Sequence, residues 1–155
     1  MSSPSDRDPA GVPPLANETQ AQLGQFVDRA AVNQPIRCAT LQKLAAEHGV
    51  PPAHIFAAAA NATTVEFVRE HKTAFVVCAG NCQEKGALDH LAYLLEKREP
   101  RLKAWFKKAF DVETRGCLNR CDHSPVVRVH TRDGVFYLDR ATREDIDEAI
   151  TATCR

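Results

Sequence analysis

The chain has 155 residues, 44% of them hydrophobic and 26% charged, which is ordinary for one globular domain. Its 20 basic residues balance its 20 acidic ones, and this argues against nucleic acid as the main partner, because phosphate binding calls for an excess of cations. No apolar run approaches the roughly 20 residues of a membrane span. Residues 1–16 are proline-rich and unlike a secretory signal. We therefore expect a disordered tail and a cytoplasmic location.

Residues 17–70 are predicted to form a small all-helical region. Apolar residues recur at helical spacing from Asn17, a plausible cap, and Gly49 ends a second helix. A third helix begins near Pro52, and the chain is expected to turn helical again before Glu70.

The pattern changes at Thr73, and residues 73–155 are predicted to form an α/β domain. The expected elements are a strand at 74–77, a helix at 86–97, further helical turns from Pro100, a strand at 110–114, a hairpin of strands 126–130 and 135–138, and a helix after Thr142. Thr142 and Asp145 have the spacing of a capping box. Residues expected in the core include Leu88, Leu91, Leu94, Leu95, Leu102, Trp105, Phe106, Ala109, Ile146, Ala149 and Ile150. The order β-α-β-β-β-α resembles a thioredoxin-like domain, with a mixed sheet and a helix on either side.

Four of the six cysteines form two matched pairs, Cys78 with Cys82 and Cys117 with Cys121. Each pair has three intervening residues and follows a predicted strand. If the helix between these strands is a crossover, the strands are parallel and their carboxyl ends share one edge of the sheet. Loops at such an edge are where open α/β sheets place their sites. The four thiolates are therefore expected to converge.

Spacing alone leaves several kinds of site open. A 2Fe-2S cluster takes four thiolates, two for each iron. Zinc also accepts four sulfurs, although its structural knuckles more often have two residues between cysteines. A thioredoxin-type dithiol has two intervening residues, one fewer than Cys78 and Cys82, and leaves the second pair unexplained. Disulfides or inert thiols are the remaining alternatives, and a reducing compartment disfavours disulfides.

The residues around both pairs resemble the thioredoxin-like 2Fe-2S ferredoxins. The resemblance covers residues 73–150 and is most specific from Gly116 to Val127, with 34 residues between Cys82 and Cys117. The segment from Val50 to Phe56 is similar to the branch that forms the small cluster-bearing subunit of NADH dehydrogenases (complex I), NAD-linked hydrogenases and formate dehydrogenases. Two departures stand out. That branch usually has four residues inside the first pair, and it is aromatic where this chain has four alanines after Phe56.

The resemblance implies one-electron transfer through a 2Fe-2S cluster. Cys78 and Cys82 would hold one iron, and Cys117 and Cys121 the other. Gly80 and Gly116 would let backbone N–H groups approach the sulfurs and tune the potential. The chain would be no enzyme on its own, since NADH or flavin chemistry would belong to a partner subunit. The implied partner is a flavoprotein or NAD(H)-binding oxidoreductase subunit, and a second copy of the chain is a further candidate.

Other residues near the pairs have simpler interpretations. Cys38 and Cys154 lack paired spacing and are interpreted as small buried hydrophobes. His123 is interpreted as a solvated loop histidine, since four cysteines already suffice. Arg115, Arg120 and Lys85 flank the cysteines, and are either ordinary surface charges or groups that offset cluster charge or dock a partner. Pro125 begins a predicted strand, where proline is tolerated, and the peptide bond before it is a candidate for the cis form.

Three functions therefore compete at the level of sequence: an electron-transfer subunit or stand-alone ferredoxin, a zinc-stabilised interaction module, and a thiol–disulfide enzyme. The first predicts bound iron and sulfide, the second redox silence, and the third a single critical cysteine. No phosphate-binding loop, catalytic triad or acid–base pair is recognisable in the sequence.

Overall fold

The computed structural model describes residues 16–32, 35–61, 66–80, 83, 85–104 and 109–154. Side chains are described within these ranges except at Asn17, residues 99–104 and Cys121. The predicted tail therefore lies outside the described residues apart from Ala16. Trp105 and Phe106 of the predicted core, and the side chain of Leu102, also lie outside them.

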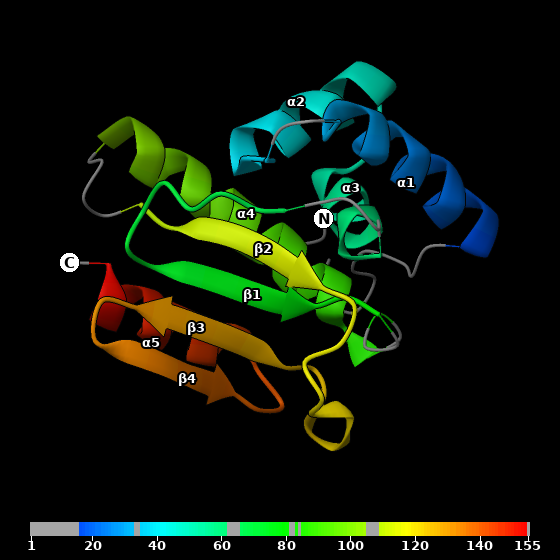
Figure 1. Ribbon diagram of the computed structural model, residues 1–155. Coiled ribbons are helices and arrows are strands. Elements are labelled where there is room, and N and C mark those ends of the chain that lie inside the picture. The colour runs from blue at the N-terminus through cyan, green and yellow to red at the C-terminus, as the bar shows by residue number, and fades with distance from the viewer. Residues whose placement is uncertain are drawn as a thin grey trace, which may run out of the picture.

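The described elements follow the order expected from the sequence: helices first, then a mixed sheet with helices. They are α1 (Asn17–Ala30), α2 (Cys38–His48), α3 (Pro52–Ala60), β1 (Ala74–Cys78), α4 (Ala87–Ala104), β2 (Asp111–Arg115), β3 (Val127–Thr131), β4 (Gly134–Leu138) and α5 (Arg143–Thr153) (Figure 1). No helix among them is long and apolar enough to cross a membrane.

The four strands form one sheet in the order β2-β1-β3-β4. β1 and β2 are parallel and are joined through α4, as the crossover argument predicts. β3 pairs antiparallel with both β1 and β4. The β3–β4 hairpin turns at Arg132 and Asp133, where the hydroxyl of Thr131 accepts from the Asp133 N–H and donates to the Gly134 carbonyl. The predicted hairpin is therefore confirmed.

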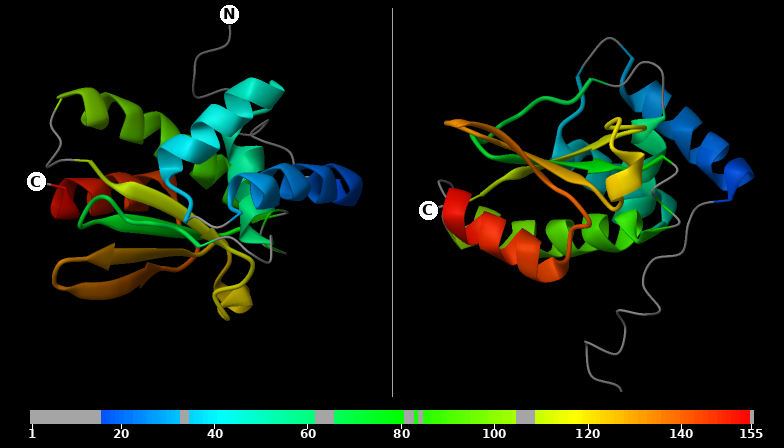
Figure 2. Two further views of the ribbon diagram at one scale, coloured as in Figure 1. Left: turned by 45° about the horizontal axis from the view of Figure 1, so that its top comes forward. Right: turned by 90° about the horizontal axis from the view of Figure 1, so that it is seen from below.

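Both α4 and α5 lie on the same face of the sheet (Figure 2), so the prediction of a helix on either side is wrong. The register places Phe75, Val77, Val127 and Val129 on one face, all of them buried, and the charged Arg128 on the other. A helix must bury its apolar stripe, so both helices pack on the apolar face. The connection from β2 to β3 contains only a one-turn 3-10 helix, Cys121–His123. No described helix covers the opposite face.

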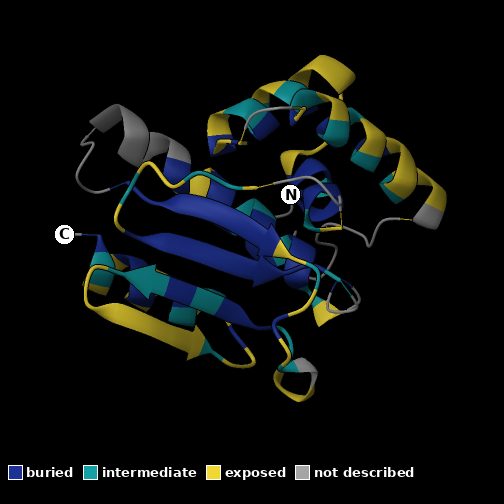
Figure 3. Ribbon diagram, in the orientation of Figure 1, coloured by how far each residue is buried: buried dark blue, intermediate teal, exposed yellow. Residues whose placement is uncertain are grey.

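The N-terminal helices share one hydrophobic core with the sheet. α3 packs against both α4 and β2, and the hydroxyl of Thr114 in β2 donates to the Phe56 carbonyl at 2.6 Å. The buried guanidinium of Arg98 in α4 donates to the Phe110 carbonyl at 2.8 Å and reaches the amide oxygen of Gln42 in α2 at 3.4 Å. These contacts explain why β2, although an edge strand, is buried over most of its length (Figure 3).

Three local predictions differ from the structure. Asn17 is the first helical residue, and Ala16 takes the cap position without a side-chain bond. Residues 66–70 form no helix, and a parallel bridge joins Phe67 to Ile36 instead. α4 continues through Pro100 to Ala104 instead of restarting there. Tertiary pairing overrides local propensity in the second case.

The capping box at the start of α5 is confirmed. The Thr142 hydroxyl accepts from the Asp145 N–H at 3.1 Å, and the Asp145 carboxylate accepts from the Thr142 N–H at 3.0 Å. Thr142→Ala should lower the free energy of unfolding by about 1 kcal/mol, because it leaves one helix donor without its partner. Urea denaturation would measure this. Exposed Thr151 in the same helix provides the control, and Thr151→Ala should change stability by no more than a few tenths of a kcal/mol.

Candidate metal centre

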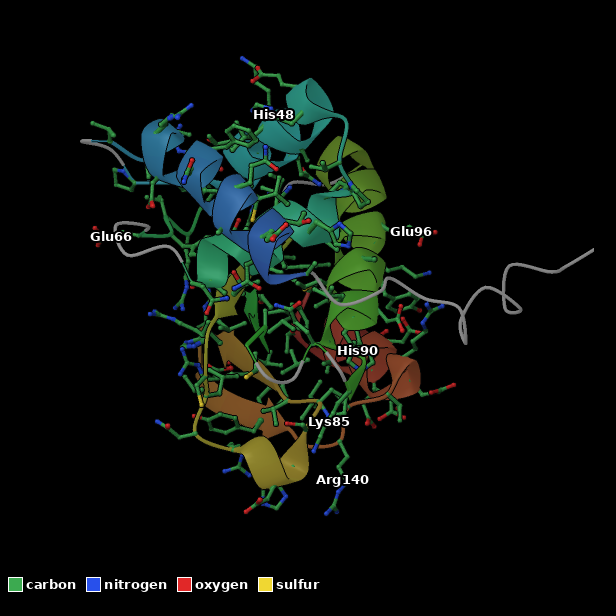
Figure 4. All side chains as sticks on the ribbon, turned by 90° about the vertical axis from the view of Figure 1, so that its right-hand side faces the viewer. His48, Glu66, Lys85, His90, Glu96 and Arg140 are labelled. Carbon is green, nitrogen blue, oxygen red and sulfur yellow. The ribbon has the colours of Figure 1, made fainter. Side chains whose placement is uncertain are left out.

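The two cysteine-bearing loops meet at one edge of the sheet. Cys78 ends β1 and is in register with Arg115, the last residue of β2, two residues before Cys117. The Ala79 N–H donates to the Arg115 carbonyl at 2.8 Å, and the Cys78 thiol lies 3.9 Å from the Gly116 carbonyl oxygen. The predicted convergence of the two loops is therefore confirmed for the residues described. Figure 4 looks onto this edge, where exposed Lys85 and Arg140 point to solvent.

Glycines allow the close approach of the loops. A Cβ atom at Gly80 would lie 2.0 Å from the Gly116 carbonyl oxygen, a distance that no side chain can occupy. A Cβ atom at Gly116 would lie 3.2 Å from the side-chain oxygen of Asn61, at the end of α3. The two glycines thus pack backbone on backbone, which ties the first cysteine loop to the second.

The sulfur of Cys117 receives a backbone hydrogen bond. Asn119 adopts φ +59°, and its N–H donates to the Cys117 sulfur at 3.2 Å. Cys117 is exposed, whereas Cys78 is only 3% exposed. An N–H group aimed at sulfur stabilises negative charge there, which is the environment that a thiolate ligand requires.

Of the four predicted ligands, one is not described and another is described only in its backbone. Cys82 lies outside the described residues, and Cys121 opens the one-turn helix with its side chain outside them. Within the described part, no group of three His, Cys, Asp or Glu side chains is placed to hold a metal ion. The structure therefore places one cysteine of each pair at the shared edge, and the four-sulfur set remains a prediction.

Two side chains that the sequence argument overlooked hold these loops in place. The buried amide of Gln83 donates to the Ala79 carbonyl at 2.7 Å and to the Gln20 side-chain oxygen in α1 at 3.1 Å. Asn61 donates to the Ala57 carbonyl at 3.4 Å and packs beneath Gly116. The position of Gln83 directly after Cys82 could have indicated its role from the sequence. Nothing in the sequence marks Asn61, because its contact depends on how α3 packs.

An ion pair and an aromatic contact fix the second loop from outside. The Arg120 guanidinium donates to the Asp139 carboxylate at 2.8 Å and lies 4.5 Å from the centre of the Tyr137 ring. The hydrogen bond from Arg120 holds the pKa of Asp139 below its usual range. Both side chains are solvent-accessible, so the pair contributes little to stability. Its role is to orient the Cys117 loop against β4.

The histidines near this edge have different roles. His123 is exposed, as predicted, and lines a shallow depression of about 400 Å³ with Cys117, Asn119, Arg120 and Asp122. His90 in α4 is buried, with its Nε2 2.7 Å from the Ala141 carbonyl oxygen. Burial lowers the pKa of His90, so its ring is neutral at pH 7.

The Ser124–Pro125 peptide is cis, and the Pro125 carbonyl accepts from the Ala141 N–H at 2.8 Å.

The remaining cysteines, Cys38 and Cys154, are both buried, as predicted. Cys38 has a further role that the sequence did not indicate. Its thiol donates to the Val112 carbonyl at 3.0 Å and accepts from the Val112 N–H at 3.1 Å. An edge strand leaves alternate backbone groups unpaired. Cys38 therefore caps the outer edge of β2 with one atom and joins α2 to the sheet.

Cys38→Ala should destabilise the fold by about 1–2 kcal/mol, because both Val112 backbone groups lose their partner. The effect should depend on pH. Burial raises the pKa of Cys38 from 9.0 to about 11, so the contribution of the thiol is complete below about pH 9 and is lost as pH rises through about 11. Urea denaturation of wild type and variant at pH 7, 9 and 10.5 would measure it. A difference that is constant across this range would contradict the assignment.

No protein-family model matches this chain, and a search of curated proteins finds no match either.

Proposed function

We propose that the chain holds a 2Fe-2S cluster and transfers single electrons, as a subunit of a flavin- or NAD(H)-linked oxidoreductase complex. One observation carries the proposal. The parallel β1–β2 pair brings two loops with C-x3-C spacing into backbone contact at Gly80 and Gly116, where the register sets Cys78 against Arg115. Two loops with two thiolates each are the donor set that such a cluster takes.

The sheet supports the finer assignment to the thioredoxin-like 2Fe-2S ferredoxins. In that assignment the two ligand loops follow β1 and β2, and the strand order is β2-β1-β3-β4 with β3 and β4 antiparallel neighbours. The packing of α3 under the second loop gives the helical N-terminal region a part in the proposed site.

Each residue has a defined task in this proposal. Cys78 and Cys82 bind one iron, and Cys117 and Cys121 bind the other. The bound cluster supplies a centre that accepts and releases one electron. The Asn119 N–H bonds to the Cys117 sulfur and offsets negative charge there, which raises the reduction potential. Arg115, in register with Cys78, adds positive charge at the same edge.

The burial of Cys78 weighs against a thiol–disulfide enzyme. Disulfide exchange requires an accessible thiolate, and Cys78 is 3% exposed with its thiol directed at the Gly116 carbonyl. The exposed Cys117 is accessible, but its pair has three intervening residues and opens no described α-helix.

Metal analysis and electron paramagnetic resonance of the full chain, purified without oxygen, test the proposal. We expect about two irons and two sulfides per chain, visible absorption, and a reversible one-electron signal after dithionite reduction. Zinc bound to the same sulfurs, with no signal, would instead favour the interaction module. Co-purification with a flavoprotein would separate the subunit role from that of a stand-alone ferredoxin. A cytoplasmic location remains part of the proposal.

A further inference from the structure

The face of the sheet opposite α4 and α5 carries arginine side chains beside the cysteine edge. Register places Arg115 and Arg128 on this face, together with His130, Val135 and Tyr137, and we call these five residues the open sheet face. Tyr137 lies opposite Arg128 on the neighbouring strand. Arg128, His130, Val135 and Tyr137 are neighbours on β3 and β4. Arg115 lies on β2, on the other side of β1, whose residues Cys78 and Val76 are buried between them.

Among the described residues, neither arginine of this face has a carboxylate partner. Among the described residues, the arginines in ion pairs are Arg69 with Glu113, Arg98 with Asp111, and Arg120 with Asp139. Neither Arg115 nor Arg128 takes part in such a pair within the part of the chain that the structure describes.

A neutral histidine accompanies the two unpaired arginines. The Nε of Arg128 donates to the Nε2 of His130 at 2.8 Å, which requires an unprotonated ring nitrogen. Burial and the charges of Arg69 and Arg128 lower the pKa of His130. Asp111 and Glu113 of β2 lie on the same face, but each is already ion-paired, Asp111 with Arg98 and Glu113 with Arg69. Arg115 and Arg128 therefore leave the face with an excess of positive charge, although the whole chain has none.

The composition of the open sheet face is that of an interface. Val135 is 53% exposed and Tyr137 is 39% exposed. Tyrosine and arginine are enriched where proteins bind proteins, and an exposed aromatic ring beside unpaired guanidinium groups provides both apolar area and charge. Charge of one sign also steers association and selects a partner of the opposite sign.

We propose that the open sheet face docks an acidic surface of the protein that exchanges electrons with the chain. This inference rests on the proposed electron-transfer function and names the chemistry of the partner: a protein surface rich in Asp and Glu. Carboxylates of the partner would pair with Arg115 and Arg128, and an apolar side chain would pack against Tyr137 and Val135. Because Arg115 is in register with Cys78, docking here brings the partner to the cysteine edge.

Binding of a fluorescein-labelled poly-glutamate peptide to the full chain, followed by fluorescence anisotropy at low and at physiological salt, tests this. The double variant Arg115→Gln, Arg128→Gln should bind about tenfold more weakly at low salt. The double variant Arg115→Lys, Arg128→Lys keeps the charge and should bind within a few-fold of wild type. The control, Arg37→Gln with Arg132→Gln, removes the same charge from other exposed positions and should leave the affinity unchanged.

Several outcomes would overturn the proposal. These are an equal loss in the control variant, binding that is independent of salt, tighter binding of single-stranded DNA than of poly-glutamate at physiological salt, and a shift in oligomeric state caused by the Gln variant, which would assign the face to a second copy. Iron and sulfide content, measured in the same samples, reports separately on the proposed function. A cluster-bearing protein without arginine-dependent binding refutes only the docking surface. Arginine-dependent binding by a protein without iron refutes the cluster and leaves the surface in place.

Discussion

Cys117→Ser should abolish the two-iron centre, since the proposed site has two sulfurs for each iron and no spare ligand. Serine replaces a soft thiolate with a hydroxyl that binds iron poorly. The loss should be visible as a fall in iron to a small fraction of the wild-type content, together with loss of the dithionite-induced signal. Because Cys117 is exposed and ends no strand, the fold itself should persist.

Comparing the cysteine variants shows whether the loss of iron is specific to the four predicted ligands. Cys78→Ser, Cys82→Ser and Cys121→Ser should each cause the same loss, whereas Cys154→Ser should keep the full iron content. Cys154 is buried at the end of α5, so circular dichroism must show that this control is folded. Cluster content that depends on only one of the four would contradict the four-ligand assignment and return the thiol–disulfide enzyme to consideration.

The parallel pairing of β1 with β2 and the β3–β4 hairpin were predictable because they follow from local signals. The apolar run before Cys78, the amphipathic crossover helix, and the Asp133–Gly134 turn each indicate one element, and the crossover rule then requires β1 and β2 to be parallel. Convergence of the cysteine loops follows from that alone. Residues 66–70 show where local reasoning fails, since Phe67 pairs with Ile36, about 30 residues away, and the segment is not helical.

The position of the helices could not be derived in the same way. The second face of a sheet is covered only if a connection between strands on that side contains a helix. The β2–β3 connection contains only the short Cys121–His123 turn. The alternation of Val127 and Val129 with Arg128 and His130 was the available clue. It shows that β3 has one apolar and one charged face, so a single layer of helices suffices.

The roles of Gly80 and Cys38 were beyond prediction because both are long-range contacts of the backbone. The sequence suggested that Gly80 and Gly116 give N–H groups access to sulfur. The structure shows a different use, with the two loops packed against each other. Likewise, Cys38 caps Val112 across 74 positions in the chain.

Gly80→Ala should have the largest effect of any change that leaves the ligands themselves intact. The new methyl group would meet the Gly116 carbonyl oxygen at 2.0 Å, so the two loops must separate. This oxygen belongs to the backbone of the residue directly after β2, so it cannot rotate away as a side chain would. We expect a loss of about 3 kcal/mol in the free energy of unfolding. We also expect a marked fall in iron content, because the cysteine pairs move apart with their loops.

The matched control for this change is Gly24→Ala, on α1. A Cβ atom at Gly24 meets nothing within 4 Å, so alanine should stabilise the helix by about 0.5–1 kcal/mol and leave the iron content unchanged. Urea denaturation and iron analysis of both variants separate a general glycine effect from one that is specific to the loop contact. Wild-type iron content in Gly80→Ala would show that the site tolerates separation of the loops. The contact at Gly116 would then serve the fold alone, and the case for a single four-sulfur centre would lose its structural basis.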